Sequence, residues 1–262
     1  MPRTAASAIL LTTGLLVGVA PGVLAQQHAE PGAEPEKAAD MTTAATPVKD
    51  ELDAFRAAFL QRADDDKIQT YQKGIDDVAA SGVLDTALKV GDAAPDFNLP
   101  NALGESVTLS TLLAEGPVVI TWYRGGWCPY CNIQLKGFQD ILPELTEAGA
   151  QLVAISPETP DNSFNTKQKS DLEFHVLSDV DNAVARDFGI AYALPTEVSD
   201  AFNKGGLKLD EWNGSGNWDL PLSVTYVIDQ SGTVRYAYVD PDYRNRAEPS
   251  ETLDTVREIT GR

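Results

Sequence analysis

Two apolar runs separated by a helix-like segment constrain the fold of this chain more than any other feature. Residues 118–123 are almost continuously apolar, which is typical of a strand buried on both faces. Apolar side chains then recur at helical spacing from Leu135 to Leu145, and residues 151–156 form the second run. A strand, a helix and a strand in this order predict a parallel pair joined by a right-handed crossover. We therefore expect an α/β fold, with Pro143 kinking the helix.

The only two cysteines of the chain, Cys128 and Cys131, follow the first run. Pro129 suits the first position of a helix, so Cys128 is expected at the helix N-terminus. Unpaired N–H groups and the helix dipole stabilise a thiolate there, which predicts a lowered pKa and makes Cys128 the candidate nucleophile. Cys131 lies on the same helix face and is the natural resolving thiol, able to close a disulfide with Cys128. The carboxyl end of a strand is also where open α/β sheets place their chemistry.

A zinc site and a structural disulfide are the other interpretations of this pair. Zinc would need two further Cys or His ligands, whereas the histidines, His28 and His175, lie in a polar stretch and an apolar run. A structural disulfide would close a very short loop and stabilise little in a chain large enough to build a normal core. Redox chemistry is therefore favoured, and we predict neither a metal nor a cofactor.

The first 25 residues have the pattern of a secretory signal peptide. Arg3 precedes an uncharged stretch that extends through Ala20, and small residues lead up to Ala25. The apolar stretch is short for a membrane span and contains glycine and proline. We expect a periplasmic or secreted protein that is not inserted in the membrane after cleavage. In an oxidising compartment the cysteine pair would need a reducing partner.

Composition divides the rest of the chain. Residues 26–48 are rich in Ala, Glu, Pro and Thr and predict a disordered tether. Residues 50–86 show helical spacing and predict an N-terminal helical extension, followed by the main domain over 88–262. Within that domain, residues 191–219 are irregular and rich in Gly, Asn and Trp, which is typical of an insertion or lid.

The chain has 20 basic and 39 acidic side chains, which argues against nucleic acid or anionic membranes as partners.

The order of the remaining elements resembles the thioredoxin fold. A hairpin is expected over 224–239 with its turn at 229–232, and a final helix over 249–259. Together with a Cys-x-x-Cys motif at a strand-to-helix junction, this arrangement resembles a central mixed sheet flanked by helices. The resemblance thus implies a thioredoxin-like α/β fold that carries an N-terminal helical extension.

Three segments narrow the resemblance to peroxiredoxin-like proteins of the alkyl hydroperoxide reductase/thiol-specific antioxidant (AhpC/TSA) family. They are Val-Gly-Asp-Ala-Ala-Pro-Asp-Phe-Asn-Leu at 90–99, Trp-Tyr-Arg-Gly-Gly-Trp-Cys-Pro-Tyr-Cys at 122–131 and Tyr-Val-Ile-Asp at 226–229. The resemblance implies that Cys128 attacks a peroxide and becomes a sulfenic acid. Cys131 would resolve it as an intrachain disulfide, which a thioredoxin-like donor would reduce.

The resemblance also implies an arginine beside the thiolate, lowering its pKa and orienting peroxide oxygens. Arg246 is the matching residue, and Arg124 is a second candidate for the same role. Two positions differ from the family pattern, since Gly125 stands in place of a threonine and Thr121 in place of a proline.

Two further functions stay open. Cys-Pro-Tyr-Cys is also a glutaredoxin motif, which favours a thiol–disulfide oxidoreductase acting on protein disulfides. Ser223, at the place where thioredoxins carry a cis-proline, favours the peroxidase instead. The last alternative is a non-catalytic redox-sensing module that signals through residues 191–219.

Overall fold

The computed structural model describes residues 46–216 and 218–262, which belong to one structural unit of the chain, Ala44–Arg262. The predicted signal peptide, 1–25, and nearly all of the predicted tether lie outside the described residues. The first helix, α1 (Val48–Leu60), begins at the last residue of that tether. Among the described residues, no helix is long and apolar enough to cross a membrane.

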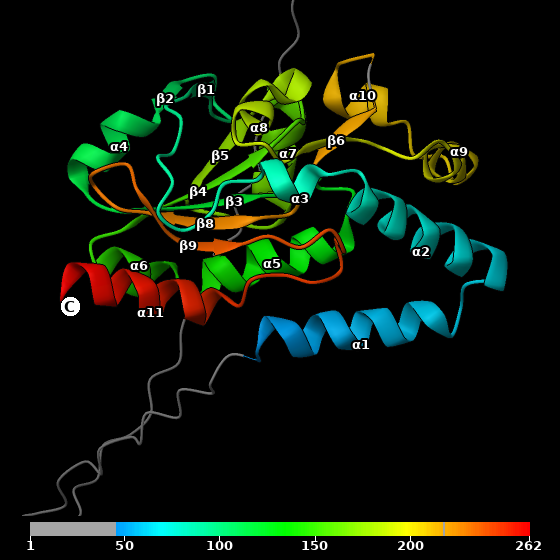
Figure 1. Ribbon diagram of the computed structural model, residues 1–262, viewed down its shortest axis with the longest axis horizontal. Helices are drawn as coiled ribbons and strands as arrows, with labels where there is room; N and C mark the ends of the chain where they lie inside the picture. Colours follow the sequence, from blue (N-terminus) through cyan, green and yellow to red (C-terminus); the bar gives the residue numbers. More distant parts are fainter. Residues whose placement is uncertain (1–45, 217) are drawn as a thin grey trace, which may run out of the picture. The chain divides into compact units, whose positions relative to one another are not determined.

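The central sheet is mixed, with its five strands in the order β5–β4–β3–β8–β9 (Figure 1). The strands are β3 (Val118–Trp122), β4 (Gln151–Ser156), β5 (His175–Ser178), β8 (Thr225–Ile228) and β9 (Val234–Tyr238). Strands β3, β4 and β5 are parallel, whereas β8 is antiparallel to both β3 and β9. Every residue of β3 is buried, because this strand is central and both of its faces are covered. The predicted α/β fold with a mixed sheet is confirmed.

Side chains of β3 alternate between two apolar clusters, one on each face of the sheet. Val119 and Tyr123 pack with Leu135 and Phe138 of α5 (Pro129–Asp140). The same cluster includes side chains of α1, α6 (Leu142–Glu147) and α11 (Pro249–Thr260), and these helices lie together in Figure 1. The cluster on the other face includes Trp122 and side chains of α4 (Leu109–Glu115) and α8 (Ala183–Asp187).

The helix predicted through Pro143 is two helices. Helix α5 ends at Asp140 and α6 starts at Leu142, with Pro143 in its first turn. Proline has no N–H to donate back along a helix, but it fits a first turn, where that N–H would be unpaired anyway. The prediction of one kinked helix was therefore wrong, and the proline starts a new helix.

The smaller elements lie along the chain between the strands of the central sheet and the helices that flank it. They are the antiparallel pair β1 (Asn98–Pro100) and β2 (Ser106–Thr108), helix α7 (Pro160–Lys169) and the 3-10 turn η1 (Val180–Asn182). The hairpin of β8 and β9 and the final helix lie where the sequence predicts them.

The helical extension consists of α1, α2 (Asp65–Ala80) and the short α3 (Val83–Thr86). Asp64 caps α2 by accepting a hydrogen bond from the Lys67 N–H at 2.8 Å. Helix α1 packs against α5, and α2 packs against α9 (Thr196–Lys204). Gly74 permits the second contact, because a Cβ there would lie 2.4 Å from the Val198 Cγ2. The extension therefore lies beside the helix that begins at the cysteines.

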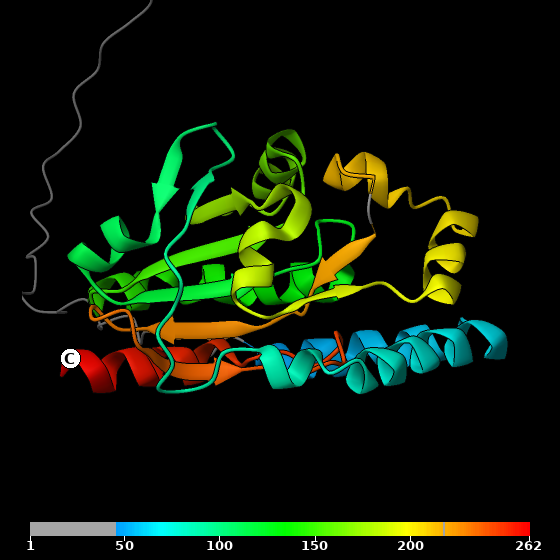
Figure 2. The same ribbon diagram turned by 45° about the horizontal axis from the view of Figure 1, so that its top comes forward.

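Residues 191–219 are more regular than predicted. They hold β6 (Ala191–Ala193), α9 and α10 (Leu209–Asn213), and β6 pairs with β7 (Asp219–Pro221) in antiparallel fashion. Figures 1 and 2 show this segment, coloured yellow to orange, near the end of the sheet beside α2. Burial of Val198 and Leu209 orders the two helices, a tertiary effect that composition does not reveal.

Candidate redox site

Cys128 and Cys131 are both free thiols at the start of α5. Cys128 is the N-cap residue, directly after the loop that leaves β3, and 2% of it is exposed. Cys131 lies one turn further on and has 0% exposure. The predicted placement at a strand-to-helix junction is therefore correct.

Arg246 reaches the pair from the loop between β9 and α11. Its Nη2 donates to the Cys131 Sγ at 3.3 Å, and its Nη1 donates to the Asn245 carbonyl at 2.9 Å. The hydrogen bond goes to Cys131, whereas the sequence predicts a contact with the Cys128 thiolate. The Arg124 backbone N–H is a second donor to the same sulfur, at 3.4 Å.

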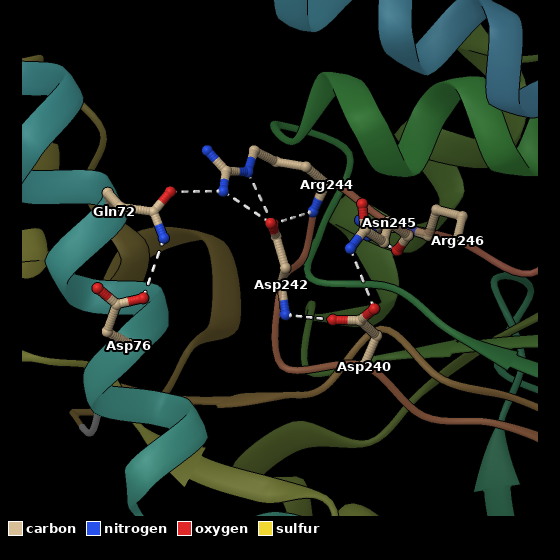
Figure 3. Close-up of polar contacts among 7 residues, drawn as sticks. All are labelled: Gln72, Asp76, Asp240, Asp242, Arg244, Asn245 and Arg246. Carbon is tan, nitrogen blue, oxygen red and sulfur yellow. Dashed lines mark hydrogen bonds and ion pairs between the residues drawn. The ribbon is translucent and has the colours of Figure 1, made fainter.

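Polar contacts fix the loop that carries Arg246 (Figure 3). The Asp240 carboxylate accepts hydrogen bonds from the Asp242 N–H at 2.7 Å and from the Asn245 amide at 3.0 Å. Asp242 pairs with Arg244 at 2.6 Å. Arg244 Nη2 also donates to Gln72 Oε1 at 2.9 Å, so α2 of the extension holds the loop that presents Arg246.

The Arg124 side chain is buried among aromatic rings. Its guanidinium carbon lies 4.2 Å from the ring centroid of Tyr243, 5.1 Å from that of Trp127 and 5.8 Å from that of Phe202. No carboxylate pairs with it in the described part of the chain, and its Nε has no hydrogen-bond partner. This buried cation is stabilised by ring faces instead.

The two thiols differ in ionisation. Burial raises the pKa of Cys128 well above its usual range, and the neighbouring Cys131 raises it further. Burial also disfavours the charged form of Cys131. However, the hydrogen bond from Cys128 and the charge of Arg246 outweigh burial and lower the pKa of Cys131 well below its usual range. The hydrogen-bond donors Arg246 Nη2 and the Arg124 N–H gather at the Cys131 sulfur and favour a thiolate there. The lowered pKa predicted for Cys128 is not found, because burial raises it and these donors contact the other sulfur.

A cavity of about 270 Å³ lies over Cys128. Aromatic residues from the extension, the β3–α5 junction, the insertion and the 240–246 loop line it: Phe55, Phe59, Tyr71, Trp127, Tyr130, Phe202 and Tyr243. Cys128 and Arg124 are in the lining, whereas Cys131 is not. A small molecule in the cavity would therefore meet the Cys128 sulfur first.

Gly125 is required by the turn before the cysteines. Its φ is +147°, a conformation that residues with a side chain rarely adopt. A Cβ at this position would lie 2.2 Å from the Trp127 Nε1. The family's threonine therefore does not fit this backbone. Thr121, at the other differing position, is buried in β3 and places its hydroxyl 3.1 Å from that of Thr225.

Gly125→Thr is expected to lower the free energy of unfolding by about 2–4 kcal/mol, through backbone strain and crowding together. Thermal and denaturant unfolding measure the change. Gly91→Ala is the matched control, because Gly91 has a φ of +97° but a Cβ added there would meet nothing within 4 Å. Equal losses in the two variants would contradict the crowding against Trp127.

Glu158 is a site residue that the sequence analysis missed. It is fully buried and follows β4, and its Oε1 accepts a hydrogen bond from the Gly126 N–H at 2.9 Å. A polar residue just past a buried strand, at the sheet edge that carries the cysteines, was the signal available. Among the described residues, no group of His, Cys, Asp and Glu side chains could hold a metal ion.

Known proteins resemble this chain in sequence and in fold. The model of the AhpC/TSA family matches residues 90–237. Peroxiredoxin Bcp of Escherichia coli (strain K12) is 36% identical over 103 residues, which cover 39% of this chain and 65% of the relative. Peroxiredoxin Q, chloroplastic, of Oryza sativa subsp. japonica is 29% identical over 169 residues, covering 64% of this chain and 67% of the relative. The crystal structure of peroxidoxin BcpB from Mycobacterium tuberculosis has a TM-score of 0.52 at 26% identity, covering 66% of this chain and 98% of that one.

The matched region, 90–237, is more than half of the chain and includes both cysteines. Parts of the site lie outside it, namely Arg246, which contacts Cys131, and the cavity residues Tyr243, Phe55, Phe59 and Tyr71. Part of the cavity wall therefore comes from segments outside the matched region. With the cysteines at the expected junction and a mixed sheet of the expected kind, the chain belongs to the AhpC/TSA family of peroxiredoxin-like, thioredoxin-fold proteins.

Proposed function

We propose that this protein is a thiol-dependent peroxidase that reduces hydrogen peroxide or organic hydroperoxides. The observation that carries the proposal is the cysteine pair itself, with Cys128 facing a cavity and Arg246 hydrogen-bonded to Cys131 at 3.3 Å. The names of the relatives, peroxiredoxins Bcp and Q, support it.

The chemistry begins with a proton shared by two sulfurs. In the resting pair the Cys128 thiol donates to the Cys131 thiolate. When a peroxide ROOH enters the cavity, the proton moves to Cys131 and the Cys128 thiolate attacks the terminal oxygen. The O–O bond breaks, Cys128 becomes a sulfenic acid, and the leaving alkoxide takes the proton to give ROH. The buried cations Arg124 and Arg246 stabilise the charge that develops on the leaving oxygen.

Resolution follows at the same place. The Cys131 thiolate attacks the Cys128 sulfenic sulfur, an intrachain disulfide forms and hydroxide leaves. The disulfide lacks the two electrons that passed to the peroxide, and a dithiol donor of the thioredoxin type would supply two electrons to restore the thiols. The proposal includes export to the periplasm or outside the cell, supported by the signal-peptide pattern of residues 1–25.

Stoichiometric oxidation tests the proposal. Reduced protein is mixed rapidly with one equivalent of hydrogen peroxide or cumene hydroperoxide while tryptophan fluorescence is recorded, since Trp127 lines the cavity. We expect oxidation much faster than that of glutathione at the same pH, and one intrachain disulfide per peroxide by intact mass.

Insulin is the matched substrate for the rival activity. Oxidation at the rate of glutathione, combined with rapid reduction of insulin disulfides, would contradict the proposal and indicate a disulfide oxidoreductase. No reaction with either substrate would also contradict it and would favour the redox-sensing module.

A further inference from the structure

Glu158 is a buried carboxylate without a cation beside it. None of its side chain is exposed, and no basic residue pairs with it in the part of the chain that the structure describes. Burying an unpaired carboxylate costs several kcal/mol, and a glutamine of the same shape would avoid much of that cost. Packing alone therefore does not explain why this position carries a charge.

The hydrogen bonds of Glu158 fix the turn that leads into the cysteines. Its Oε1 accepts from the Gly126 N–H at 2.9 Å, and its Oε2 accepts from the Tyr123 hydroxyl at 2.9 Å and the Thr166 hydroxyl at 3.1 Å. The other side of the Gly126 peptide is held as well, because the Asn132 amide donates to its carbonyl at 2.9 Å. Gly126 is thus clamped at both its N–H and its C=O.

The buried charges of the site balance only when Glu158 is counted. Arg124 and Arg246 are cations, and the opposing anions are Glu158 and the thiolate that the pair carries when Cys131, the partner of Arg246, ionises. The Tyr123 hydroxyl donates to Glu158, and the pKa of Tyr123 is raised, first by burial and then by the Glu158 charge. Burial raises the pKa of Glu158, and the charge of Cys131 raises it further, so the carboxylate and the thiolate repel each other.

We propose that Glu158 is a positioning residue that clamps the turn before Cys128 and whose negative charge shifts the cysteine pair from dithiol toward disulfide. When a small disulfide such as oxidised dithiothreitol oxidises the pair, a Cys128–Cys131 S–S bond forms and the S–S bond of the oxidant breaks. Two electrons and the Cys128 proton pass to the oxidant's sulfurs, the thiolate disappears and the repulsion is relieved. Glu158 then remains as one negative charge that partly offsets the two arginines. The inference rests on the redox role of the pair but not on peroxide being its oxidant.

The test is therefore made without peroxide. Wild type and Glu158→Gln are equilibrated with mixtures of reduced and oxidised dithiothreitol, and the thiolate is titrated by its ultraviolet absorbance. For Glu158→Gln we expect a thiol pKa about one unit lower and an equilibrium shifted about tenfold toward the dithiol, which corresponds to about 30 mV. A structural role alone would move neither quantity.

Two variants separate charge from geometry. Glu158→Asp keeps the charge but shortens the reach to Gly126, so its thiol pKa and equilibrium should stay near those of wild type while its stability falls. Asp179→Asn neutralises another buried carboxylate, one that caps α8 by accepting from the Val184 and Ala185 N–H groups. It should move neither redox quantity. The proposal would be overturned if a folded Glu158→Gln kept the thiol pKa and the dithiol–disulfide equilibrium of wild type. It would also be overturned if Glu158→Gln and Glu158→Asp shifted these two quantities equally.

Discussion

Replacing Cys128 with serine is expected to abolish the fast reaction with peroxide, whereas Cys131→Ser should react and stop at the sulfenic acid. Cys128 faces the cavity, and a serine hydroxyl at its position cannot ionise to attack an oxygen near neutral pH. Cys131 is outside the cavity lining, so its loss blocks resolution but leaves the attacking sulfur in place. Rapid mixing with peroxide measures the rates, and dimedone labelling with mass spectrometry identifies the trapped product.

The Cys131→Ser variant also tests the ionisation of the pair. Cys131 raises the pKa of Cys128 through its hydrogen bond and its charge, so removing it lowers that pKa. A lower pKa gives more thiolate at a given pH, and the pH–rate profile of the variant should therefore move to lower pH. Fast oxidation that survives in Cys128→Ser would contradict these assignments and make Cys131 the attacked sulfur.

The core of the fold was predictable because its signals are local. The apolar run that forms β3 and the Pro129 helix start each lie within a few residues, and together they locate the cysteines at the junction. The helix break at Pro143 is also a local effect, but the same proline can kink a helix or begin a new one. The order within 191–219 depends on burial of Val198 and Leu209 by distant segments.

Much of the site was not predictable, because distant segments build it. Phe55 and Tyr71 are ordinary apolar positions of amphipathic helices in the sequence, yet both line the cavity over Cys128. Arg246 was found only through the family resemblance. The lowered pKa predicted for Cys128 is not found, because the helix N-terminus is a local effect, whereas burial of Cys128 and the Arg246 contact with Cys131 are tertiary.

Arg246→Met is expected to slow oxidation of the pair by peroxide about 100- to 1000-fold near neutral pH. Methionine keeps much of the apolar stem but removes the charge whose Nη2 lies 3.3 Å from the Cys131 Sγ. That charge lowers the pKa of both thiols, so its loss raises them. The pair then ionises only at higher pH, and the pH–rate profile should move upward by the same amount as the thiol titration.

Two variants sharpen the result. Arg246→Lys keeps a positive charge but not the guanidinium geometry, so it should restore the pH profile more fully than the rate. Arg257 on α11 forms an exposed ion pair with Glu144 on α6. Arg257→Met removes one positive charge there and should leave both the oxidation rate and the pH–rate profile unchanged. If Arg246→Met is oxidised by peroxide at a rate within twofold of wild type, the contact between Arg246 and Cys131 does not contribute to the reaction. Slow oxidation in Arg246→Met with an unchanged pH–rate profile would contradict a role at the thiolate, because only a contact with the thiolate makes the effect of this cation depend on pH. That result would assign Arg246 to the peroxide oxygens alone.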